Sequence, residues 1–430
     1  MAQTKANQKK KKPLTAARIW KTFAGDGRHG DMSLSFFAYV MILLVVGIVM
    51  MSSASYAWAY SEHDGDGLFY AKNQAKHAVI GFCALLFFMK MDYHNLKNIR
   101  IPLIKRFNIA SILYALGLLF LFLALAIGND EGGSMGAKRW LTLGPVNFQP
   151  SEFAKLAIIV FFAYNMERDG KKMNSFKTGI LKYSGFMLVY AVLLYLEPHL
   201  SGLILIATIS VAMILCGGAN KKQFVILGLI VVTTAAIVIA VQASDPDSYV
   251  SVRIKSWRHP FDDVLDDTWQ TANSIIAIGS GGMFGLGLGN SRQKYMYLPE
   301  TKNDFVFPIV CEELGFVGAL AIIIVFFLLV VEGYSIAVRC KDRFGMLIAV
   351  GITTQIGIQT VLNLAVVSNL IPNTGISLPF FSYGGTSLIM QLAEMGIMLN
   401  ISQQRYYPDE KKARKKKRVP APERAELKNA

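Results

Sequence analysis

The chain has 430 residues, 53% of them hydrophobic, and a formal net charge of +15 that lies mostly in every second gap between long apolar segments. This pattern is typical of a polytopic membrane protein rather than a soluble domain. The four cysteines have no paired spacing and the six histidines have no metal-ligand spacing, so we expect neither disulfides nor a dedicated metal cage. The glycine-rich stretch 281–287 is not followed by Lys and Ser or Thr, so ATP-driven chemistry is not expected.

Ten apolar segments predict an all-α fold of ten transmembrane helices. Most segments reach the roughly 20 residues that a helix needs to cross a bilayer. The fifth and sixth are short, and only Glu197, Pro198 and His199 separate them, so they fit either a re-entrant hairpin or two spans joined by a tight turn. In chain order, the predicted spans are 33–54, 76–92, 107–127, 150–166, 183–196, 200–216, 222–242, 306–333, 344–368 and 383–402.

The distribution of Lys and Arg predicts the side of the membrane that each gap faces. If the N-terminus is cytoplasmic, both tails and the four gaps on the same side contain 32 of the 44 Lys and Arg residues, as expected when cationic flanks stay inside. This count favours two spans for the short pair. We therefore expect a basic cytoplasmic tail (1–31), a ten-helix membrane domain (32–402) and a second basic cytoplasmic tail (403–430). The polybasic tails favour contact with anionic lipid over nucleic acid.

The outer gap at 128–150 is dense in polar and aromatic residues, including Lys138, Arg139 and Trp140. The fourth span should begin just after this gap, because Pro150 suits the first turn of a helix. Glu152 and Lys155 then share one helix face and lie close enough to pair. Charges at this depth are costly unless they face a wet cavity or each other, so the pair is either functional or a simple helix-end ion pair.

The largest outer gap, 243–305, has more than 60 residues and several large anchoring aromatics. Loops of this length between packed elements are usually functional or disordered, and the aromatic content favours order. The stretch 268–278, which contains Gln270 and Ser274, reads as a short amphipathic helix ending at a run of glycines. We expect this large loop, between the seventh and eighth helices, to be structured and to lie against the outer membrane surface.

A third outer gap, 369–387, contains two prolines, several glycines and several hydroxyls, among them Ser377, Ser382 and Tyr383. Such a composition predicts shaped, non-helical backbone at membrane depth. Backbone of this kind is tolerated only where it is buried in protein or lines an aqueous cavity. We therefore expect this segment to form part of a site.

Together these loops resemble the SEDS family, the shape, elongation, division and sporulation proteins of bacteria. The resemblance covers nearly all of the chain between its tails. The matching motifs are Lys138-Arg139-Trp140, Gln149-Pro150-Ser151-Glu152-Phe153-Ala154-Lys155, Gly285-Leu286-Gly287-Leu288-Gly289-Asn290-Ser291, Tyr297-Leu298-Pro299-Glu300, Asn303-Asp304-Phe305-Val306-Phe307, Glu312-Glu313-Leu314-Gly315 and Leu378-Pro379-Phe380-Phe381-Ser382-Tyr383-Gly384-Gly385. The sequence departs from the family pattern at Lys302-Asn303, where His-Thr is usual, and at His199, where the family commonly has Asp.

The resemblance implies a peptidoglycan glycosyltransferase that polymerises lipid II at the outer face of the bacterial cytoplasmic membrane. It also implies a class B penicillin-binding protein as the crosslinking partner. The motifs at 287–300 are more similar to the division and sporulation members than to the elongation member, which favours work at the division septum with other divisome proteins. No cofactor is firmly implied, although a divalent cation remains possible at the diphosphate.

The chemistry requires a base for the acceptor hydroxyl and cations for the departing diphosphate. Asp304 is the candidate catalytic base, because it lies where the large loop re-enters the membrane and partial desolvation should raise its pKa. An aspartate that only caps the eighth span is the structural alternative. Glu312 or Glu313 could instead pair with Lys155. The candidate substrate-binding residues are Lys138, Arg139, Trp140, Glu152, Lys155, Gln270, Ser274, Lys294, Glu300, Ser377, Ser382 and Tyr383.

Two other functions fit parts of the pattern. A lipid II flippase would share the ten spans and the buried Glu and Lys, and a helix pair broken at Pro198 would suit alternating access. A scaffold that only recruits a transpeptidase would explain the tails but not the dense outer loops. The candidate reactive groups cluster on the outer side rather than through the thickness of the membrane, and this favours the polymerase.

Overall fold

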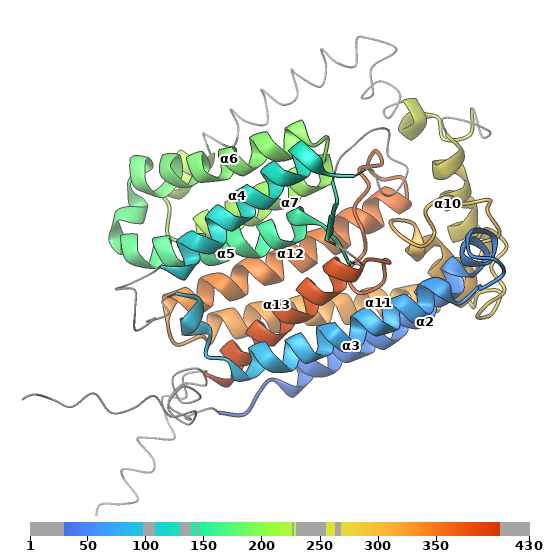
Figure 1. Ribbon diagram of the computed structural model, residues 1–430, viewed down its shortest axis with the longest axis horizontal. Helices are drawn as coiled ribbons and strands as arrows, with labels where there is room; N and C mark the ends of the chain where they lie inside the picture. Colours follow the sequence, from blue (N-terminus) through green and yellow to red (C-terminus); the bar gives the residue numbers. More distant parts are fainter. Residues whose placement is uncertain are drawn as a thin grey trace, which may run out of the picture.

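The computed structural model describes residues 30–97, 108–129, 139–143, 146–225, 228, 255–262 and 268–404. Within these ranges the chain is mostly helical, as predicted, and its long helices form one bundle (Figure 1). A single small hairpin pairs β1 (Leu141–Leu143) with β2 (Val146–Phe148) in the described part. The main helices are α2 (Leu34–Glu62), α3 (Phe69–Lys90), α4 (Ile109–Ile127), α5 (Pro150–Asp169), α6 (Lys182–Leu196), α7 (Leu200–Cys216), α10 (Trp269–Ser280), α11 (Val306–Val338), α12 (Arg343–Val367) and α13 (Gly385–Gln403).

Nine of the ten predicted spans coincide with helices of the structure. The short fifth and sixth segments form two separate helices, α6 and α7, joined by a tight turn. Most of the seventh segment, 222–242, most of the loop from 243 to 267, and both basic tails lie outside the described residues. Five described helices are long and apolar enough to cross a membrane: α2, α4, α11, α12, and α6 together with the turn before it. The total of ten spans stays a prediction.

The helix ends differ from the predicted spans at the beginning of the chain. α2 continues to Glu62 although the apolar segment ends near residue 54, and α3 begins at Phe69 rather than at residue 76. Hydropathy marks where the chain leaves hydrocarbon, whereas the backbone hydrogen bonds of a helix continue into the polar interface. Both helices therefore extend beyond their apolar segments and carry polar residues to the loops at this end of the bundle.

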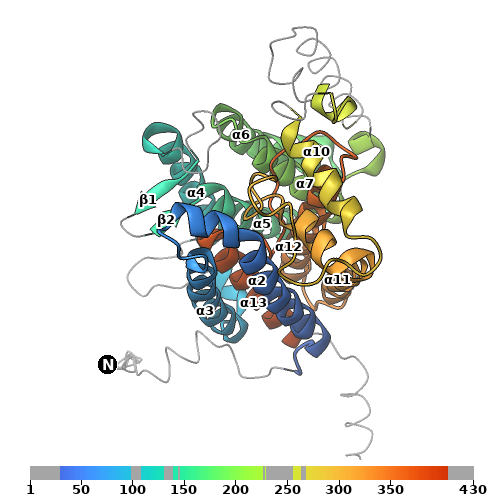
Figure 2. The ribbon, with the colours of Figure 1, turned by 90° about the vertical axis from the view of Figure 1, so that its right-hand side faces the viewer.

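The centre of the bundle is formed by α5, α12 and α13, whose side chains are buried on nearly all sides. The end-on view in Figure 2 shows these helices surrounded by α2, α3, α4, α6, α7 and α11. α3 and α13 pack very closely: a Cβ atom added to Gly396 would lie only 2.4 Å from the carbonyl oxygen of Leu85. A small residue at the contact thus sets the separation of this helix pair, as is common in membrane bundles.

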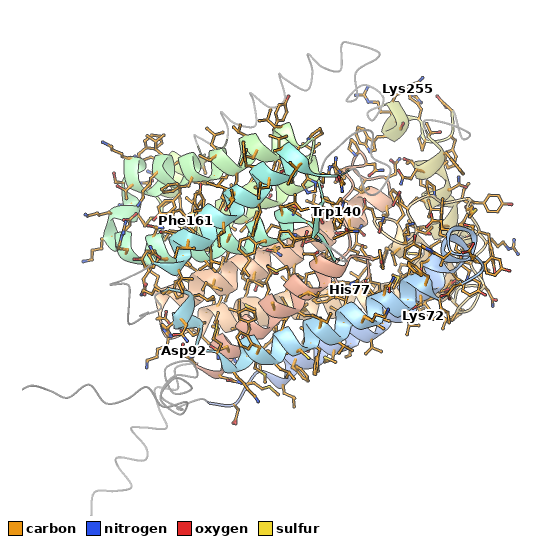
Figure 3. The ribbon with its side chains drawn as sticks, in the orientation of Figure 1. Lys72, His77, Asp92, Trp140, Phe161 and Lys255 are labelled. Carbon is orange, nitrogen blue, oxygen red and sulfur yellow. The ribbon has the colours of Figure 1, made fainter. Side chains whose placement is uncertain are left out.

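The connecting segments gather at two opposite ends of the bundle. At one end the side chain of Gln404 donates a hydrogen bond to Asp92, and at the other end Lys302 pairs with Glu62. Figure 3 shows Asp92 and Lys72 at these two ends. The two partners in each of these contacts belong to segments predicted on the same side of the membrane, so these contacts agree with the alternation inferred from charge. The identity of the cytoplasmic end stays a prediction.

A break in α11 holds the large outer loop against the bundle. Gly315 has φ +69° and ψ −173° within an otherwise regular helix. The backbone groups freed by the break bond to the segment 282–287, which contributes two carbonyls and two N–H groups. These bonds are Phe316 N to Gly282 O (2.9 Å), Val317 N to Met283 O (3.1 Å), Leu286 N to Glu312 O (2.9 Å) and Gly287 N to Glu313 O (3.0 Å). Irregular backbone is therefore satisfied by protein, as membrane depth requires.

Replacement of Gly315 by Ala should destabilise the protein strongly. The positive φ alone costs a residue with a side chain on the order of 1–3 kcal/mol. The new Cβ would also lie 2.2 Å from the backbone nitrogen of Gly285, which cannot move without breaking the bonds at the kink. Thermal unfolding of purified protein in detergent should show a clearly lower midpoint. Gly185→Ala is the matched control, because its added Cβ would enter open space beside α6; equal midpoints for the two variants would contradict this account of the break.

Candidate functional site

The segment that carries Asp304 is fixed through its backbone. The carbonyl oxygens of Lys302, Asn303 and Asp304 each accept a hydrogen bond from a different donor. These donors are, in the same order, the backbone N–H of Tyr383 (2.7 Å), the hydroxyl of Ser382 (2.7 Å) and the side-chain amide of Asn363 (2.8 Å). Residues 369–384, the third predicted outer segment, and α12 therefore hold the segment that carries Asp304 in place, and the Asp304 carboxylate takes no part in this.

The Asp304 side chain is half-buried and lies just before the start of α11. Burial and the nearby Glu300 carboxylate together raise its pKa to about 7, and Arg139 acts in the opposite direction. The side-chain amide of Asn303 donates a hydrogen bond of 2.6 Å to Glu300 and holds that carboxylate. A Cβ atom on Gly375 would lie 3.3 Å from Oδ2 of Asp304, so the third outer segment passes close to the acid. A carboxylate with a pKa near neutrality is suited to general-base catalysis.

Side-chain amides from three helices shape the non-helical segment 369–384. Gln359 of α12 donates to the carbonyl oxygen of Ser377 at 3.0 Å and to its hydroxyl at 3.3 Å. Asn363 donates to Ile376 O at 2.6 Å, in addition to its bond to Asp304 O. The remaining amides are Gln74 of α3, bonded to Ser382 O (3.1 Å), and Gln391 of α13, which accepts from Phe380 N (3.0 Å). None of these four amides was among the sequence candidates.

Glu152 and Lys155 form the predicted pair at the start of α5. Their charged groups lie 2.9 Å apart, and the two side chains are only 8% and 2% exposed. Glu152 also accepts a bond of 3.3 Å from the hydroxyl of Ser387, to which Gln391 donates at 3.0 Å. Lys155 thus pairs with Glu152 rather than with Glu312 or Glu313.

A second buried carboxylate lies near this pair. Glu394 of α13 is completely buried and accepts a bond of 2.9 Å from the amide of Gln355. It is within electrostatic range of both Lys155 and Glu152. Sequence analysis missed Glu394, although a lone acid inside an apolar span is itself a signal, because such residues normally face the interior of a bundle.

Arg139 contacts the turn between α6 and α7 and acts on Asp304 through its charge. Its guanidinium donates a hydrogen bond to Pro198 O and is in electrostatic range of Asp304, Glu197 and His199. Burial raises the pKa of Glu197 to about 8, with Arg139 opposing. Burial lowers the pKa of His199 to about 3, with Arg139 and then Lys155 acting in the same direction. Both groups are therefore mostly neutral at pH 7.

Four other predicted substrate-binding residues are Gln270, Ser274, Trp140 and Lys138. Gln270 and Ser274 fasten α10 to its neighbours: Gln270 accepts from Asn373 at 2.8 Å, and the Ser274 hydroxyl donates to Val367 O at 2.6 Å. Trp140 is half-buried, and its carbonyl accepts from Asn129 N at 2.9 Å (Figure 3 labels Trp140). Lys138 lies outside the described residues.

Lys294 belongs to a separate buried cluster. Its ammonium lies 3.0 Å from Glu313 and also donates to the Ser53 hydroxyl of α2 at 3.1 Å, with only 3% of the side chain exposed. The neighbouring Glu312 accepts bonds from the N–H groups of Arg292 (3.0 Å) and Gln293 (3.2 Å). These contacts fix the loop before Tyr297 on α2 and α11. The structure does not bring Lys294 into contact with Asp304 or Lys155.

Metal ligands do not cluster in the described ranges: no group of three His, Cys, Asp or Glu residues there is arranged to hold an ion. A divalent cation that accompanies the diphosphate of a substrate stays a prediction.

A family model and several known proteins match most of this chain. A family model described as "Cell cycle protein" (FtsW, RodA and SpoVE) matches residues 33–407. Stage V sporulation protein E of Bacillus subtilis is 38% identical over 368 residues, which are 85% of this chain and 96% of that protein. A probable peptidoglycan glycosyltransferase FtsW of Geobacter sp. is 35% identical over 362 residues, which are 84% of this chain and 94% of that protein.

Two solved structures share the fold. A chain from a peptidoglycan synthase complex, solved to explain the coordination of polymerization and crosslinking, has a TM-score of 0.71 and 26% identity. It matches over 87% of this chain and 98% of its own length. The rod shape determining protein RodA of Thermus thermophilus has a TM-score of 0.61 and 25% identity, over 87% of this chain and 98% of its own.

Proposed function

Because the chain belongs to the family of cell cycle proteins that contains FtsW, RodA and SpoVE, we propose that it is a peptidoglycan glycosyltransferase that polymerises lipid II. The single observation that carries this proposal is the position of Asp304, a carboxylate with a pKa of about 7 at the loop end of the bundle, beside Arg139. The work takes place at the outer face of the bacterial cytoplasmic membrane. Septal wall synthesis, with a class B penicillin-binding protein and divisome proteins as partners, is the cellular role that we propose.

In the proposed reaction, a hydroxyl of the acceptor sugar attacks the anomeric carbon of the donor sugar, which is linked to the lipid diphosphate. Asp304 removes the hydroxyl proton as the new glycosidic bond forms, and the bond to the lipid diphosphate breaks. The diphosphate leaves with its negative charge, which the guanidinium of Arg139 and the ammonium of Lys155 stabilise electrostatically. Lys138, next to Arg139 in the sequence, is a further candidate for this role. Glu300 maintains the raised pKa of the base through its own charge.

Lipid II flipping is the alternative, and one observation favours it: Gln355 and Glu394 lie deeper in the bundle than Asp304. A flippase, however, needs polar groups through the whole thickness of the membrane. The buried positions of α12 between its start and Ile352 are all apolar or glycine: Phe344, Gly345, Leu347, Ile348, Ala349, Val350, Gly351 and Ile352. The buried polar residues of α12 therefore occur only beyond Ile352, in the part nearer to Asp304. This distribution supports the polymerase.

The decisive experiment uses purified protein and labelled lipid II, with and without a class B penicillin-binding protein. Glycan strands resolved on a gel are the expected product. A matched assay in liposomes measures movement of lipid II between leaflets. Movement without glycan would overturn the polymerase in favour of the flippase.

The proposed topology places both termini in the cytoplasm and the Asp304 end outside. In a variant without the four native cysteines, Ser61→Cys should react with a membrane-impermeant thiol reagent on intact cells. Lys341→Cys should react only after the cells are permeabilised. Both positions are exposed, and they lie at opposite ends of the bundle. The reverse pattern of labelling would show that the charge count assigned the sides wrongly.

A further inference from the structure

Lys302 lies two residues before Asp304. It connects residues 300–305, called the reactive segment below, to the predicted outer ends of α2 and α3. Its ammonium donates hydrogen bonds to the Glu62 carboxylate (3.0 and 3.3 Å) and to the Tyr70 hydroxyl (2.9 Å). It also lies 4.4 Å from the centre of the Tyr70 ring and 5.7 Å from that of Trp58. Tyr70 itself donates to Glu62. α2 and α3 are thus joined to each other and to the reactive segment by one side chain.

The same cluster includes the third outer segment. Tyr383 donates its backbone N–H to Lys302 O, and its ring packs edge-on against Tyr70 with centroids 4.9 Å apart. Burial alone would lower the pKa of Lys302, but its bonds to Tyr70 and Glu62 raise the pKa, so the ammonium stays charged. The Lys302 side chain is 19% exposed and that of Glu62 is 37% exposed, so the pair is partly shielded from screening by salt.

The reactive segment needs such an external hold. Glu300 has φ +55°, a conformation that costs a residue with a side chain on the order of 1–3 kcal/mol and persists only where the surroundings enforce it. The N-cap position of α11, Phe305, has no side-chain cap. Without outside contacts, the turn that carries Asp304 would therefore relax.

We propose that Lys302 is a positioning residue for Asp304, which it holds in place by tying residues 300–305 to Glu62 of α2 and Tyr70 of α3. This inference rests on the proposed function, in which Asp304 is the base. Lys302 touches no reacting atom and acts only through the geometry of the segment. A displacement of about 1 Å at a catalytic group can lower a rate about 100-fold.

Lys302→Met tests the proposal against a matched control, Lys72→Met. Lys72 forms a similar ion pair, 2.9 Å from Asp66, at the same end of the bundle, but it does not contact the reactive segment. We expect Lys302→Met to lower kcat for lipid II polymerisation at least about tenfold with KM nearly unchanged. Lys302→Arg should retain most of the activity, because it keeps the charge.

Hydrogen–deuterium exchange on the protein alone gives a readout that does not depend on activity. The N–H groups of Asn303 and Phe305 both bond to Glu300 O, and their exchange should become faster in Lys302→Met but not in Lys72→Met. Faster exchange together with a lower kcat supports the proposal. A lower kcat with unchanged exchange would mean that Lys302 acts on substrate directly and would overturn it, as would an unchanged kcat.

The variant Glu62→Gln provides a second test of the proposal. If Lys302 acts through Glu62, the double variant Lys302→Met/Glu62→Gln should be no slower than the worse single variant, because both changes remove one interaction. Additive losses would overturn the proposal. A wild-type protein that makes no glycan would instead overturn the proposed function, whereas the exchange comparison would still report whether Lys302 holds the segment.

Discussion

Asp304→Asn should abolish nearly all glycan synthesis while the protein stays folded. Loss of a general base typically lowers kcat about 10²–10⁴-fold. The substitution leaves the reactive segment in place, because Asn363 bonds to the backbone carbonyl of Asp304 and not to its side chain. Polymerisation of labelled lipid II, measured next to thermal unfolding, separates loss of chemistry from loss of fold.

Asp66→Asn is the matched control for this change. Asp66 is a partly exposed acid at the same end of the bundle, paired only with Lys72 among ionic partners in the described part. The Asp66→Asn variant should polymerise lipid II at the wild-type rate. If Asp304→Asn also stays within a few-fold of wild type, the base lies elsewhere, and Glu300 becomes the next residue to test.

The pH dependence provides an independent check on Asp304. The base must be ionised, so kcat/KM should rise as the pH increases through about 7 and then level off. Glu300 raises the pKa of Asp304 through its negative charge, so Glu300→Gln should move this rise to lower pH. A profile that does not move in Glu300→Gln would show that a different group titrates.

Much of the fold and part of the site could be predicted from sequence for a physical reason. Long apolar runs must become helices at membrane depth, because only internal hydrogen bonds can satisfy their backbone. The spacing of Glu152 and Lys155 also predicts their contact, because helix geometry places residues i and i+3 side by side. In both cases the information is local in the chain.

The rest of the site depends on contacts between segments far apart in the sequence. Gln355, Gln359 and Asn363 are spaced by four residues, so they share one face of α12, and this spacing of amides inside an apolar span was an available signal. Their partners, however, lie on α13, on residues 369–384 and on the segment that carries Asp304. The burial of Lys294 by Glu313 could not be read from sequence either, because the acid is 19 residues away and the break at Gly315 creates the contact. Composition alone made Lys294 look like a free outer cation.

The Glu152–Lys155 pair should have the second largest effect, and it requires a design that separates stability from catalysis. Lys155→Met leaves the buried Glu152 carboxylate without its ionic partner, and loss of one member of a buried pair costs about 3–5 kcal/mol. Glu152→Gln likewise leaves the buried Lys155 ammonium without its ionic partner. Either single variant should therefore be poorly folded, and its inactivity would say little about mechanism.

The double variant Glu152→Gln/Lys155→Met resolves this, because it removes both charges together. Replacement of a buried ion pair by neutral groups of similar volume is often neutral or stabilising, so its unfolding midpoint should return close to that of wild type. Its polymerisation rate should stay low, since the cation proposed to stabilise the departing diphosphate is gone. Lys182→Met/Asp169→Asn is the matched control, an ion pair of 2.6 Å that joins the far end of α5 to α6 and should leave the rate unchanged. If the Glu152/Lys155 double variant regains both its stability and its rate, the pair serves only the fold, and Arg139 would carry the charge of the leaving group without it.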